Sequence, residues 1–144
     1  MTIEAILRGK GGSVFTLRPE SSVGDATALL AGKRIGAVVV CDAKGRILGV
    51  LSERDIVRGM SEFGKGVYEM PVRNLMSSPV TTCSPKDSVK KMMGVMNTKR
   101  FRHLPVVDGD ELVGIVSIGD LVSARINAAE MEMGVLKDIA FARR

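Results

Sequence analysis

The sequence predicts a mixed α+β protein built from two copies of one βαββα unit. The first observation is an internal repeat: the segment from Val14 to Val40 matches the segment from Val80 to Val106 at an offset of 66 positions, which becomes 65 after the next turn. The second is that each copy alternates short β-branched runs with segments of helical apolar spacing. Two similar units can bury similar faces against each other, so the repeat predicts a central cleft with two related mouths.

The first copy divides into five elements. Val14–Leu17 is predicted to be a short strand, and Ser22 is the expected cap of a helix that runs to about Lys33. The continuous apolar run Ala37–Cys41 is short and β-branched, which is typical of a buried strand. After a turn, Ile47–Leu51 forms the next strand. A second helix begins at Ser52–Asp55, where acidic residues in the first turn interact favourably with the positive end of the helix dipole.

The second copy follows the same order. Its expected elements are a strand at Val80–Thr82, a helix capped by Asp87 or Ser88 that contains Val89, Met92, Met93 and Met96, strands at Leu104–Val107 and Leu112–Val116, and a helix from Gly119 to about Asn127.

The segments outside the repeats have their own patterns. Ser61–Met70 is Gly-rich and polar and is predicted to be a linker, and Val72–Met76 is predicted to be one helical turn. After the second copy, helical apolar spacing continues along a stripe that needs a partner, either the body of the protein or another subunit. The stripe consists of Ile126, Ala129, Met133, Leu136 and Ala140. We therefore divide the chain into a first repeat with the N-terminal segment (1–66), a second repeat (67–128) and a C-terminal helical tail (129–144).

Composition bounds the function. The net charge of +5 requires nucleic-acid binding to be considered, but aromatic residues are few and the basic residues are scattered, so a small anion such as a nucleotide phosphate is favoured. No apolar run approaches the ~18–20 residues needed to span a bilayer, and Met1–Gly12 lacks the plan of a signal peptide, so we expect a cytoplasmic protein. Cys41 and Cys83 show no metal-type spacing, and Cys41, which ends an apolar run, is expected to be a buried thiol.

Each copy ends in the same motif, Gly-x-φ-Ser-x-x-Asp, where φ is apolar. The full segments are TLRPESSV with IGAVVVCDAKGRILGVLSERD in the first copy, and TTCSPKDSV with FRHLPVVDGDELVGIVSIGD in the second. This paired pattern resembles the CBS-domain pair, or Bateman module, over about Val14 to Asn127, and most closely the small stand-alone bacterial members. The resemblance implies two units related by a pseudo-twofold axis, adenosine-containing ligands in the clefts between them, and a disc-shaped dimer.

The repeated polar residues are the candidate ligand groups. Asp55 and Asp120 each follow a Ser at the start of a helix, where a carboxylate can accept hydrogen bonds from the two hydroxyls of a ribose, the role that the resemblance implies. The alternative is that each acid only satisfies N–H groups of its own helix, and the serines can cap the same helices. Thr16 and Thr82, each three residues before a Pro, offer hydroxyls to ribose or phosphate, or are ordinary strand residues.

By the same resemblance, the residues before the second strand of each copy give backbone groups to adenine and side chains to phosphate. Arg102 and His103 resemble a basic pair that contacts phosphate in a kinase regulatory subunit of the family, in reversed order. The alternatives are a solvated arginine and a structural histidine. One expected cleft gathers Thr82, Phe101, Arg102, His103, Ser52, Arg54 and Asp55, and the other gathers Thr16, Ile35, Gly36, Ala37, Ser117 and Asp120. The first holds more positive charge and should bind phosphate better.

These observations predict a sensor that is not an enzyme. The single histidine and the absence of a nucleophilic triad or metal-ligand cluster in the sequence give catalysis little support. The expected ligand is an adenine nucleotide, with AMP first and ADP, ATP, NAD(H) or S-adenosylmethionine as alternatives. The expected partners are an unidentified regulated protein and a second copy of the chain. The homodimer is expected to form through the helices at Ser22–Lys33 and Ser52–Met60 and their counterparts in the second unit, where Val89, Met92, Met93 and Met96 offer an apolar surface. The rival hypotheses are a ligand-free scaffold and, less favoured, a nucleic-acid-binding protein.

Overall fold

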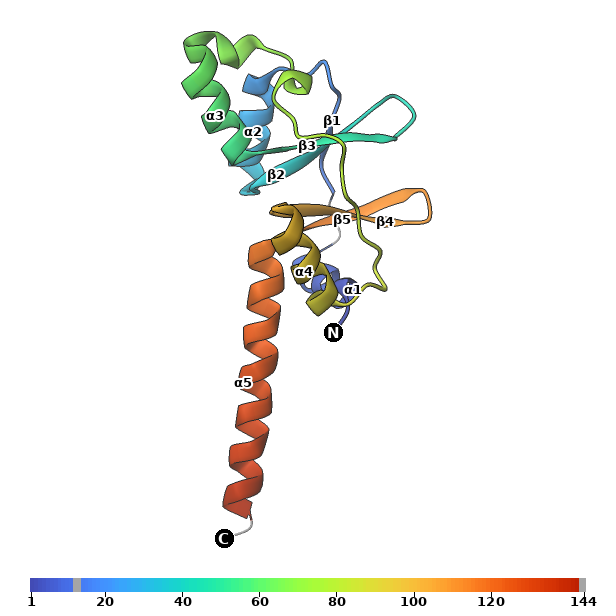
Figure 1. Ribbon diagram of the computed structural model, residues 1–144, viewed down its shortest axis with the longest axis vertical. Coiled ribbons are helices and arrows are strands. Elements are labelled where there is room, and N and C mark those ends of the chain that lie inside the picture. Colours follow the sequence, from blue (N-terminus) through green and yellow to red (C-terminus); the bar gives the residue numbers. More distant parts are fainter. Residues whose placement is uncertain (12–13, 143–144) are drawn as a thin grey trace.

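The computed structural model describes the backbone of residues 1–11 and 14–142 and, within these ranges, side chains up to Leu136. Two small units lie one above the other, each a sheet with helices beside it, and one long helix extends away from them (Figure 1). The fold is therefore the predicted mixed α+β arrangement of two repeats.

The first unit has a three-stranded sheet in the order β1-β2-β3. Strand β1 (Thr16–Leu17) is parallel to β2 (Ala37–Cys41), which is antiparallel to β3 (Ile47–Ser52). Every residue of β2 is buried, as its continuous apolar run predicts. Helix α2 (Val23–Lys33) begins at Ser22, whose hydroxyl accepts a hydrogen bond of 3.0 Å from the backbone N–H of Asp25. The predicted cap is confirmed.

The second unit has a two-stranded sheet, β4 (His103–Asp108) antiparallel to β5 (Glu111–Ser117). The strand predicted at Val80–Thr82 does not form, and pairing is limited to one parallel bridge between Cys83 and Val106. The backbone makes two ladder hydrogen bonds around Cys83, from its N–H to the Pro105 carbonyl and from the Val107 N–H to its own carbonyl. The chain then turns at Pro85, which ends the pairing.

Ser88, one of the two predicted caps, begins helix α4 (Val89–Lys99). The Ser88 hydroxyl accepts from the Lys91 N–H at 3.1 Å, whereas the Asp87 carboxylate accepts from the Ser84 N–H at 2.8 Å and closes the preceding turn. Helices α2 and α4 both end at an arginine with left-handed backbone, Arg34 at φ 55° and Arg100 at φ 59°. The two units therefore share the geometry that ends each helix, and this geometry sets the start of β4 beside the central cleft.

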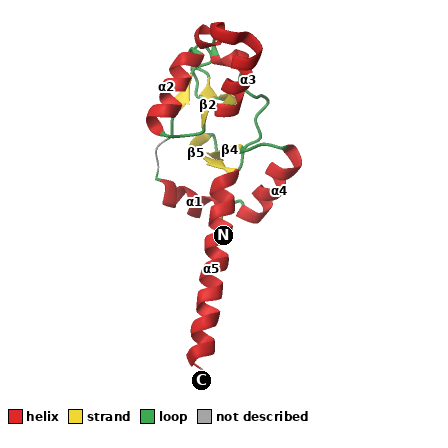
Figure 2. Ribbon diagram, turned by 90° about the vertical axis from the view of Figure 1, so that its left-hand side faces the viewer, coloured by secondary structure: helices red, strands yellow, loops and turns green. Residues whose placement is uncertain are grey.

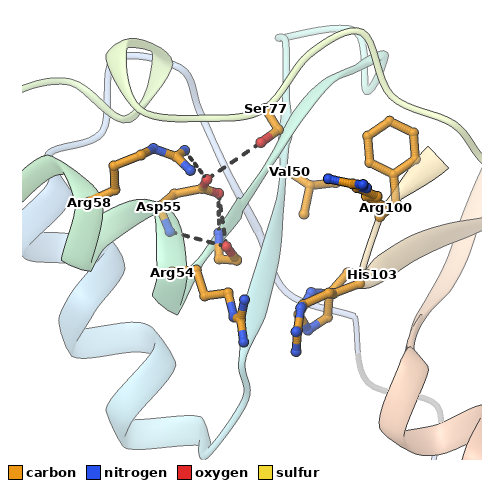
Figure 3. A pocket seen from close by; sticks show the side chains of 10 residues that line it. Val50, Arg54, Asp55, Arg58, Ser77, Arg100 and His103 are labelled. Carbon is orange, nitrogen blue, oxygen red and sulfur yellow. Dashed lines mark hydrogen bonds and ion pairs between the residues drawn. The ribbon is translucent and has the colours of Figure 1, made fainter. Parts of the chain in front are cut away.

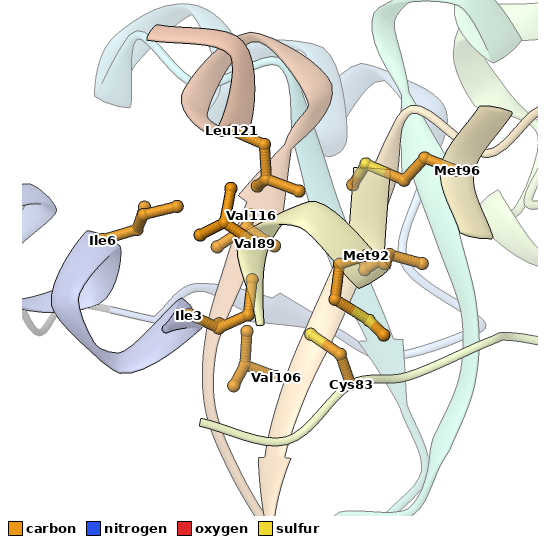
Figure 4. Close-up of a cluster of buried hydrophobic side chains, with 10 residues drawn as sticks. Ile3, Ile6, Cys83, Val89, Met92, Met96, Val106, Val116 and Leu121 are labelled. Carbon is orange, nitrogen blue, oxygen red and sulfur yellow. The ribbon is translucent and has the colours of Figure 1, made fainter. Parts of the chain in front are cut away.

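The N-terminal segment belongs with the second unit, which corrects its assignment to the first. Helix α1 (Ile3–Lys10) buries Ile3 and Ile6 in the second core, a cluster that also contains Met92, Met96 and Leu121 (Figure 4). Its Leu7 side chain packs over Gly114 on β5, and a Cβ at that position would lie 2.6 Å from a methyl carbon of Leu7, which would have to shift. Sequence periodicity does not carry this information, because the contact joins residues more than a hundred positions apart.

The apolar surface predicted to form the dimer interface on α4 is also wrong. Val89, Met92 and Met96 are buried inside the second core of the same chain and are not available to a partner (Figure 4). Cys41 is buried as expected, and Cys83 is buried as well. Burial, with a smaller effect of Asp87, raises the pKa of the Cys83 thiol to about 12, so this thiol is neutral at physiological pH.

The predicted linker Ser61–Met70 is largely helical. Helix α3 (Glu53–Phe63) continues into it and is followed by a 3-10 helix, η1 (Gly64–Glu69), which buries Val67 in the first core. The Tyr68 ring lies against Gly24, where a Cβ would come within 2.5 Å of it. The polar composition was misleading because Val67 and Tyr68 are enough to anchor the segment. The single helical turn predicted next is confirmed as η2 (Val72–Asn74).

The last helix of the second unit and the C-terminal tail form one continuous helix, α5 (Ile118–Ala142). The proposed boundary at residues 128/129 therefore falls inside a helix, and Gly134 does not interrupt it. The last two residues of the predicted tail, 143 and 144, lie outside the described residues. Among the helices described, none combines the length and apolar character needed to cross a membrane.

The packing of α1 predicts a large effect of a small change. Replacing Ile3, which is fully buried, with Ala should lower the free energy of unfolding by about 2–5 kcal/mol, because the cavity lies in the core shared by α1 and α4. Guanidinium denaturation of the full chain measures this. Val135→Ala, at a position more than half exposed, is the control and should change stability little. An effect of Ile3→Ala as small as that of the control would contradict the placement of α1.

Candidate functional site

One cleft lies between the two units (Figure 3). It encloses about 250 Å³ and is lined by residues of α3, β3, the segment joining the units, and the start of β4. We call it the Asp55 cleft. Its lining residues are Val50, Ser52, Arg54, Asp55, Arg58, Ser77, Arg100, Phe101, Arg102 and His103.

Asp55 is built into the start of α3. The Ser52 hydroxyl accepts from the Asp55 N–H at 3.3 Å, and the Asp55 Oδ2 atom accepts from the Ser52 N–H at 2.8 Å and its hydroxyl at 3.0 Å. This reciprocal pair is a capping box, so the helix-cap alternative for Asp55 is correct as a structural role.

The other carboxylate oxygen of Asp55 points to the cleft side of the helix. Its Oδ1 atom accepts a charge-assisted hydrogen bond from Arg58 and a long one, at 3.5 Å, from the Ser77 hydroxyl (Figure 3). Arg58 is 64% exposed although Asp55 is buried. Since an exposed side chain swings away at small cost, a ligand hydroxyl can replace Arg58 at Oδ1 without disturbing the cap.

Four of the ten lining residues are arginines, and Asp55 is the carboxylate among them. Arg54 and Arg102 were predicted, while Arg58 and Arg100 were not. Three of the four arginines also line an adjoining hollow of about 410 Å³ together with Met96, Asn97, Phe101 and Ile118. Guanidinium groups bind phosphate oxygens in pairs of hydrogen bonds, so the cleft and the hollow beside it bring together groups that suit an anion and the apolar side chains of Met96, Phe101 and Ile118.

The missed arginines had weak signals in the sequence. Arg58 lies one helical turn after Asp55, on the same side of α3. Arg100 occupies the position that matches Arg34 in the repeat, but only the structure shows that its left-handed backbone places it at the cleft.

The second predicted cleft is different. Asp120 repeats part of the cap, since its Oδ2 accepts from the Ser117 N–H at 2.8 Å and the Ser117 hydroxyl accepts from the Asp120 N–H at 3.0 Å. The same Oδ2 also accepts from the Lys10 ammonium at 2.7 Å, and Lys10 donates to the Ile115 carbonyl at 3.0 Å. The end of α1 therefore places a cation on the carboxylate that a ribose would use.

Lys10 changes the electrostatics of this carboxylate. Partial burial alone would raise the pKa of Asp120, but the bond from Lys10 and the bonds from Ser117 together hold it below its usual value. No sequence signal points to this contact, because Lys10 and Asp120 are far apart in the chain and in different segments.

The remaining predicted residues are divided among several places. Gly36 and Ser117 line a hollow of about 330 Å³ between the units, together with Ser52, Glu53, Arg54, Arg102, His103, Ile118 and Gly119. Ala37 is buried in β2, Ile35 packs against the first core, and Thr16 is exposed on β1. Thr82, which was expected beside Asp55, lines another hollow with Ile47, Leu48, Ser78, Pro79 and Val80. The predicted second cleft is thus only partly assembled.

His103 lies where the two clefts meet. It lines both the Asp55 cleft and the hollow of Gly36, and its imidazole Nε2 is within van der Waals distance of the position of a Cβ on Gly36. Burial lowers the pKa of His103, and the positive charge of Lys10 lowers it further, against the opposite effects of Asp120, Glu53 and Asp55. His103 is therefore a neutral hydrogen-bonding group at neutral pH.

The cleft combines polar and charged groups with one aromatic ring. Within the described ranges, no group of three or more His, Cys, Asp or Glu side chains is placed to hold a metal ion. What the cleft does offer is a fixed carboxylate, serine hydroxyls, four guanidinium groups and one aromatic ring, Phe101.

The lowered pKa of His103 predicts that the stability of the protein depends on pH. Its folded pKa lies below the ordinary 6.5, so the unfolded chain binds a proton first as the pH falls. This contribution to stability is present above pH 6.5 and is lost as the pH falls through the folded pKa. NMR titration of the single histidine should give a midpoint below 6.5, and Lys10→Met should raise it. Lys65→Met, on η1, is the control. A midpoint at or above 6.5 would contradict the burial of the ring.

Comparison with known proteins agrees with this architecture. The CBS domain family matches residues 12–62 and 72–127. The crystal structure of the CBS-domain containing protein ATU1752 from Agrobacterium tumefaciens has a TM-score of 0.81 and 39% identity, covering 86% of this chain and 92% of that one. The CBS domain-containing protein YhcV of Bacillus subtilis is 32% identical over 108 residues, which are 75% of this chain and 76% of YhcV.

A further structure shows a member of this fold with a ligand. The crystal structure of CBSX2 in complex with AMP has a TM-score of 0.72 and 25% identity, and the match covers 89% of this chain and 98% of CBSX2. Both family matches fall on the two repeats that form the units on either side of the Asp55 cleft. The chain therefore belongs to the CBS domain family, and its two repeats form a tandem CBS-domain pair.

Proposed function

We propose that this protein is a regulatory module that binds an adenine nucleotide in the Asp55 cleft and changes the activity or affinity of a partner protein. One observation carries the proposal: four arginines surround a single fixed carboxylate at the junction of the two units. A carboxylate suits the paired hydroxyls of a ribose and guanidinium groups suit phosphate. The AMP complex of CBSX2 supports the same ligand class for this chain.

The geometry suggests which residues contact the ribose, the adenine and the phosphate of the ligand. Asp55 Oδ1 accepts from the ribose after Arg58 moves aside, and Phe101 with its apolar surroundings covers the adenine. Arg54, Arg100 and Arg102 line the space into which the phosphate extends. AMP is the proposed ligand, and ADP, ATP and NAD(H) fit the same charge. S-adenosylmethionine fits less well, since its sulfonium cation would face the arginines.

The two clefts are proposed to differ in function. Lys10 already neutralises Asp120, whereas the Asp55 cleft faces solvent with a surplus of positive charge. The Asp55 cleft is therefore the main nucleotide site. We also propose that the protein has no catalytic activity and that it is located in the cytoplasm.

A ligand-free scaffold is the second candidate. One observation favours it: all the hydrogen bonds of Asp55 and the Lys10–Asp120 pair already satisfy these carboxylates within the chain. A nucleotide then has to replace hydrogen bonds that already exist within the chain. The free energy gained by this exchange decides between nucleotide binding and a ligand-free scaffold.

We also propose a homodimer through α3, one of the helices that the sequence predicts at the interface. Val57, Met60 and Phe63 are exposed on this amphipathic helix, and Val57 is 65% exposed. Large apolar side chains that recur along one exposed helix are costly in water and are typical of an interface. This surface replaces the α4 methionines as the physical reason for the predicted dimer.

The difference between the clefts is tested by removing one charge at a time. Asp55→Asn should weaken AMP binding about tenfold or more, because a charge-assisted hydrogen bond contributes about 1.5–3 kcal/mol. Asp120→Asn, the matched control in the other repeat, should change the affinity little. Isothermal calorimetry measures both, and circular dichroism checks that α3 remains folded without its acidic cap. A larger loss from Asp120→Asn would reverse the assignment, and no AMP binding by the unmodified protein would favour the scaffold.

Lys10 is tested separately. Lys10→Met keeps most of the apolar stem but removes the cation from Asp120, so the second cleft gains a carboxylate that can accept from a ribose. The calorimetric stoichiometry for AMP should rise from about one toward two per chain. Lys44→Met, in the turn between β2 and β3, is the control and should leave the stoichiometry unchanged. If Lys10→Met also leaves it unchanged, Lys10 is not what closes the second cleft.

A further inference from the structure

Helix α5 is far longer than its packing against the body requires. At 25 residues it is about 37 Å long, and its first turns pack on the second unit, where Leu121 is fully buried. Every residue from Ala129 to Leu136 is exposed, and the helix stands away from both units in two perpendicular views (Figures 1 and 2). A helix that packs against nothing is only marginally stable in water, because most helical stability comes from the packing of an apolar face. The exposed part of α5 therefore depends on a partner.

The apolar residues on the exposed part follow a heptad. Their spacing alternates between four and three residues, which keeps them on one seam of a helix in a coiled coil. The seam consists of Val122, Ile126, Ala129, Met133, Leu136 and Ala140. Val122, Ile126, Met133 and Leu136 are all exposed. The body is therefore not the partner of this seam.

A second apolar stripe on α5 is less suited to a partner helix. It begins with Leu121 and Ala124, which pack on the second core, and continues through Ala128, Met131 and Val135. The next position at the same spacing is Asp138, a charged residue that interrupts the stripe. The seam continues past this point with Ala140, so the seam is the longer of the two apolar surfaces.

The charges beside the seam identify the partner. With Ile126 and Met133 at heptad position a, Arg125 occupies position g and Glu130 the following position e. In a parallel pair of identical helices in register, position g of one helix lies beside the following position e of the other. Arg125 of each copy then faces Glu130 of the other. Glu132 and Lys137 repeat this relation one heptad later in the sequence.

An antiparallel pair would not use these charges in the same way, because it brings g beside g and e beside e. Self-complementary charges are also not expected of a helix that binds an unrelated protein. The charge pattern therefore favours a second copy of this chain in parallel orientation.

We propose that α5 pairs with α5 of a second copy as a parallel, in-register coiled coil along this seam. The inference deepens the dimer in the proposed function and does not depend on nucleotide binding. Helices α3 and α5 lie on the same side of the ribbon in Figure 1. The coiled coil would fix the relative orientation of the two chains in the dimer.

Two methionines on α5 provide a matched test. Met133 lies on the seam and Met131 faces outward from it, and both are more than half exposed in the single chain. Met133→Glu should raise the dimer dissociation constant at least tenfold, and Met131→Glu should not raise it. Sedimentation equilibrium of the full chain measures both. Equal effects, a larger effect of Met131→Glu, or an unmodified protein that stays monomeric at micromolar concentration would overturn the proposal.

Charge exchange tests the direction. Arg125→Glu alone should weaken the dimer, and adding Glu130→Arg should restore it, because the pair is exchanged between copies. Ala129→Cys, at the middle of the seam, should form an intermolecular disulfide under mild oxidation only if the same residue of both copies meets. No restoration and no crosslink would refute the parallel register. AMP calorimetry on Met133→Glu separates the two ideas, since nucleotide binding should survive loss of the seam.

Discussion

Asp55 is the buried charged residue on which the cleft depends. A carboxylate that is 5% exposed is costly unless donors surround it, and here they come from three places: the backbone and hydroxyl of Ser52, the guanidinium of Arg58 and the hydroxyl of Ser77. These contacts join the start of α3 to the segment that connects the two units. Ser77 is itself paired with Val50 of β3 through two backbone hydrogen bonds. One buried charge therefore fixes the helix, the strand end and the connecting segment that together form one wall of the site.

The two repeats show how equivalent frames acquire different roles. Both place a Ser and an Asp at the start of a helix, and both end the preceding helix at an arginine with left-handed backbone. The difference comes from outside the repeat, because α1 packs on the second unit and brings Lys10 to Asp120. The proposed nucleotide site at Asp55 and the cleft at Asp120 are thus distinguished by one N-terminal helix, and His103 between them responds to the charges of both.

Local chemistry was predictable from the sequence, and long-range packing was not. Ser22 and Ser52 cap helices through atoms three residues away, so their roles follow from the order of residues alone. Two members of the arginine cluster, Arg54 and Arg102, were found through the repeat and the resemblance. The polar composition of Ser61–Met70 concealed Val67 and Tyr68, whose packing depends on a distant glycine.

The same limit applies to α1 and α4. The apolar stripe of α4 is buried as its spacing predicts, and it packs against α1 and the second sheet. Periodicity predicts that a face is buried but does not identify the element that covers it. Thr82 shows the converse error, because a matching position in a repeat does not guarantee a matching site when the strand around it does not form.

A structure of the protein crystallised with AMP tests the central claim most directly. The account predicts the ribose hydroxyls within hydrogen-bond distance of Asp55 Oδ1, Arg58 moved away from that oxygen, and the phosphate among Arg54, Arg100 and Arg102. AMP bound at Asp120 in place of Lys10, AMP in the hollow of Thr82, or an Asp55 cleft still empty at millimolar AMP would contradict it.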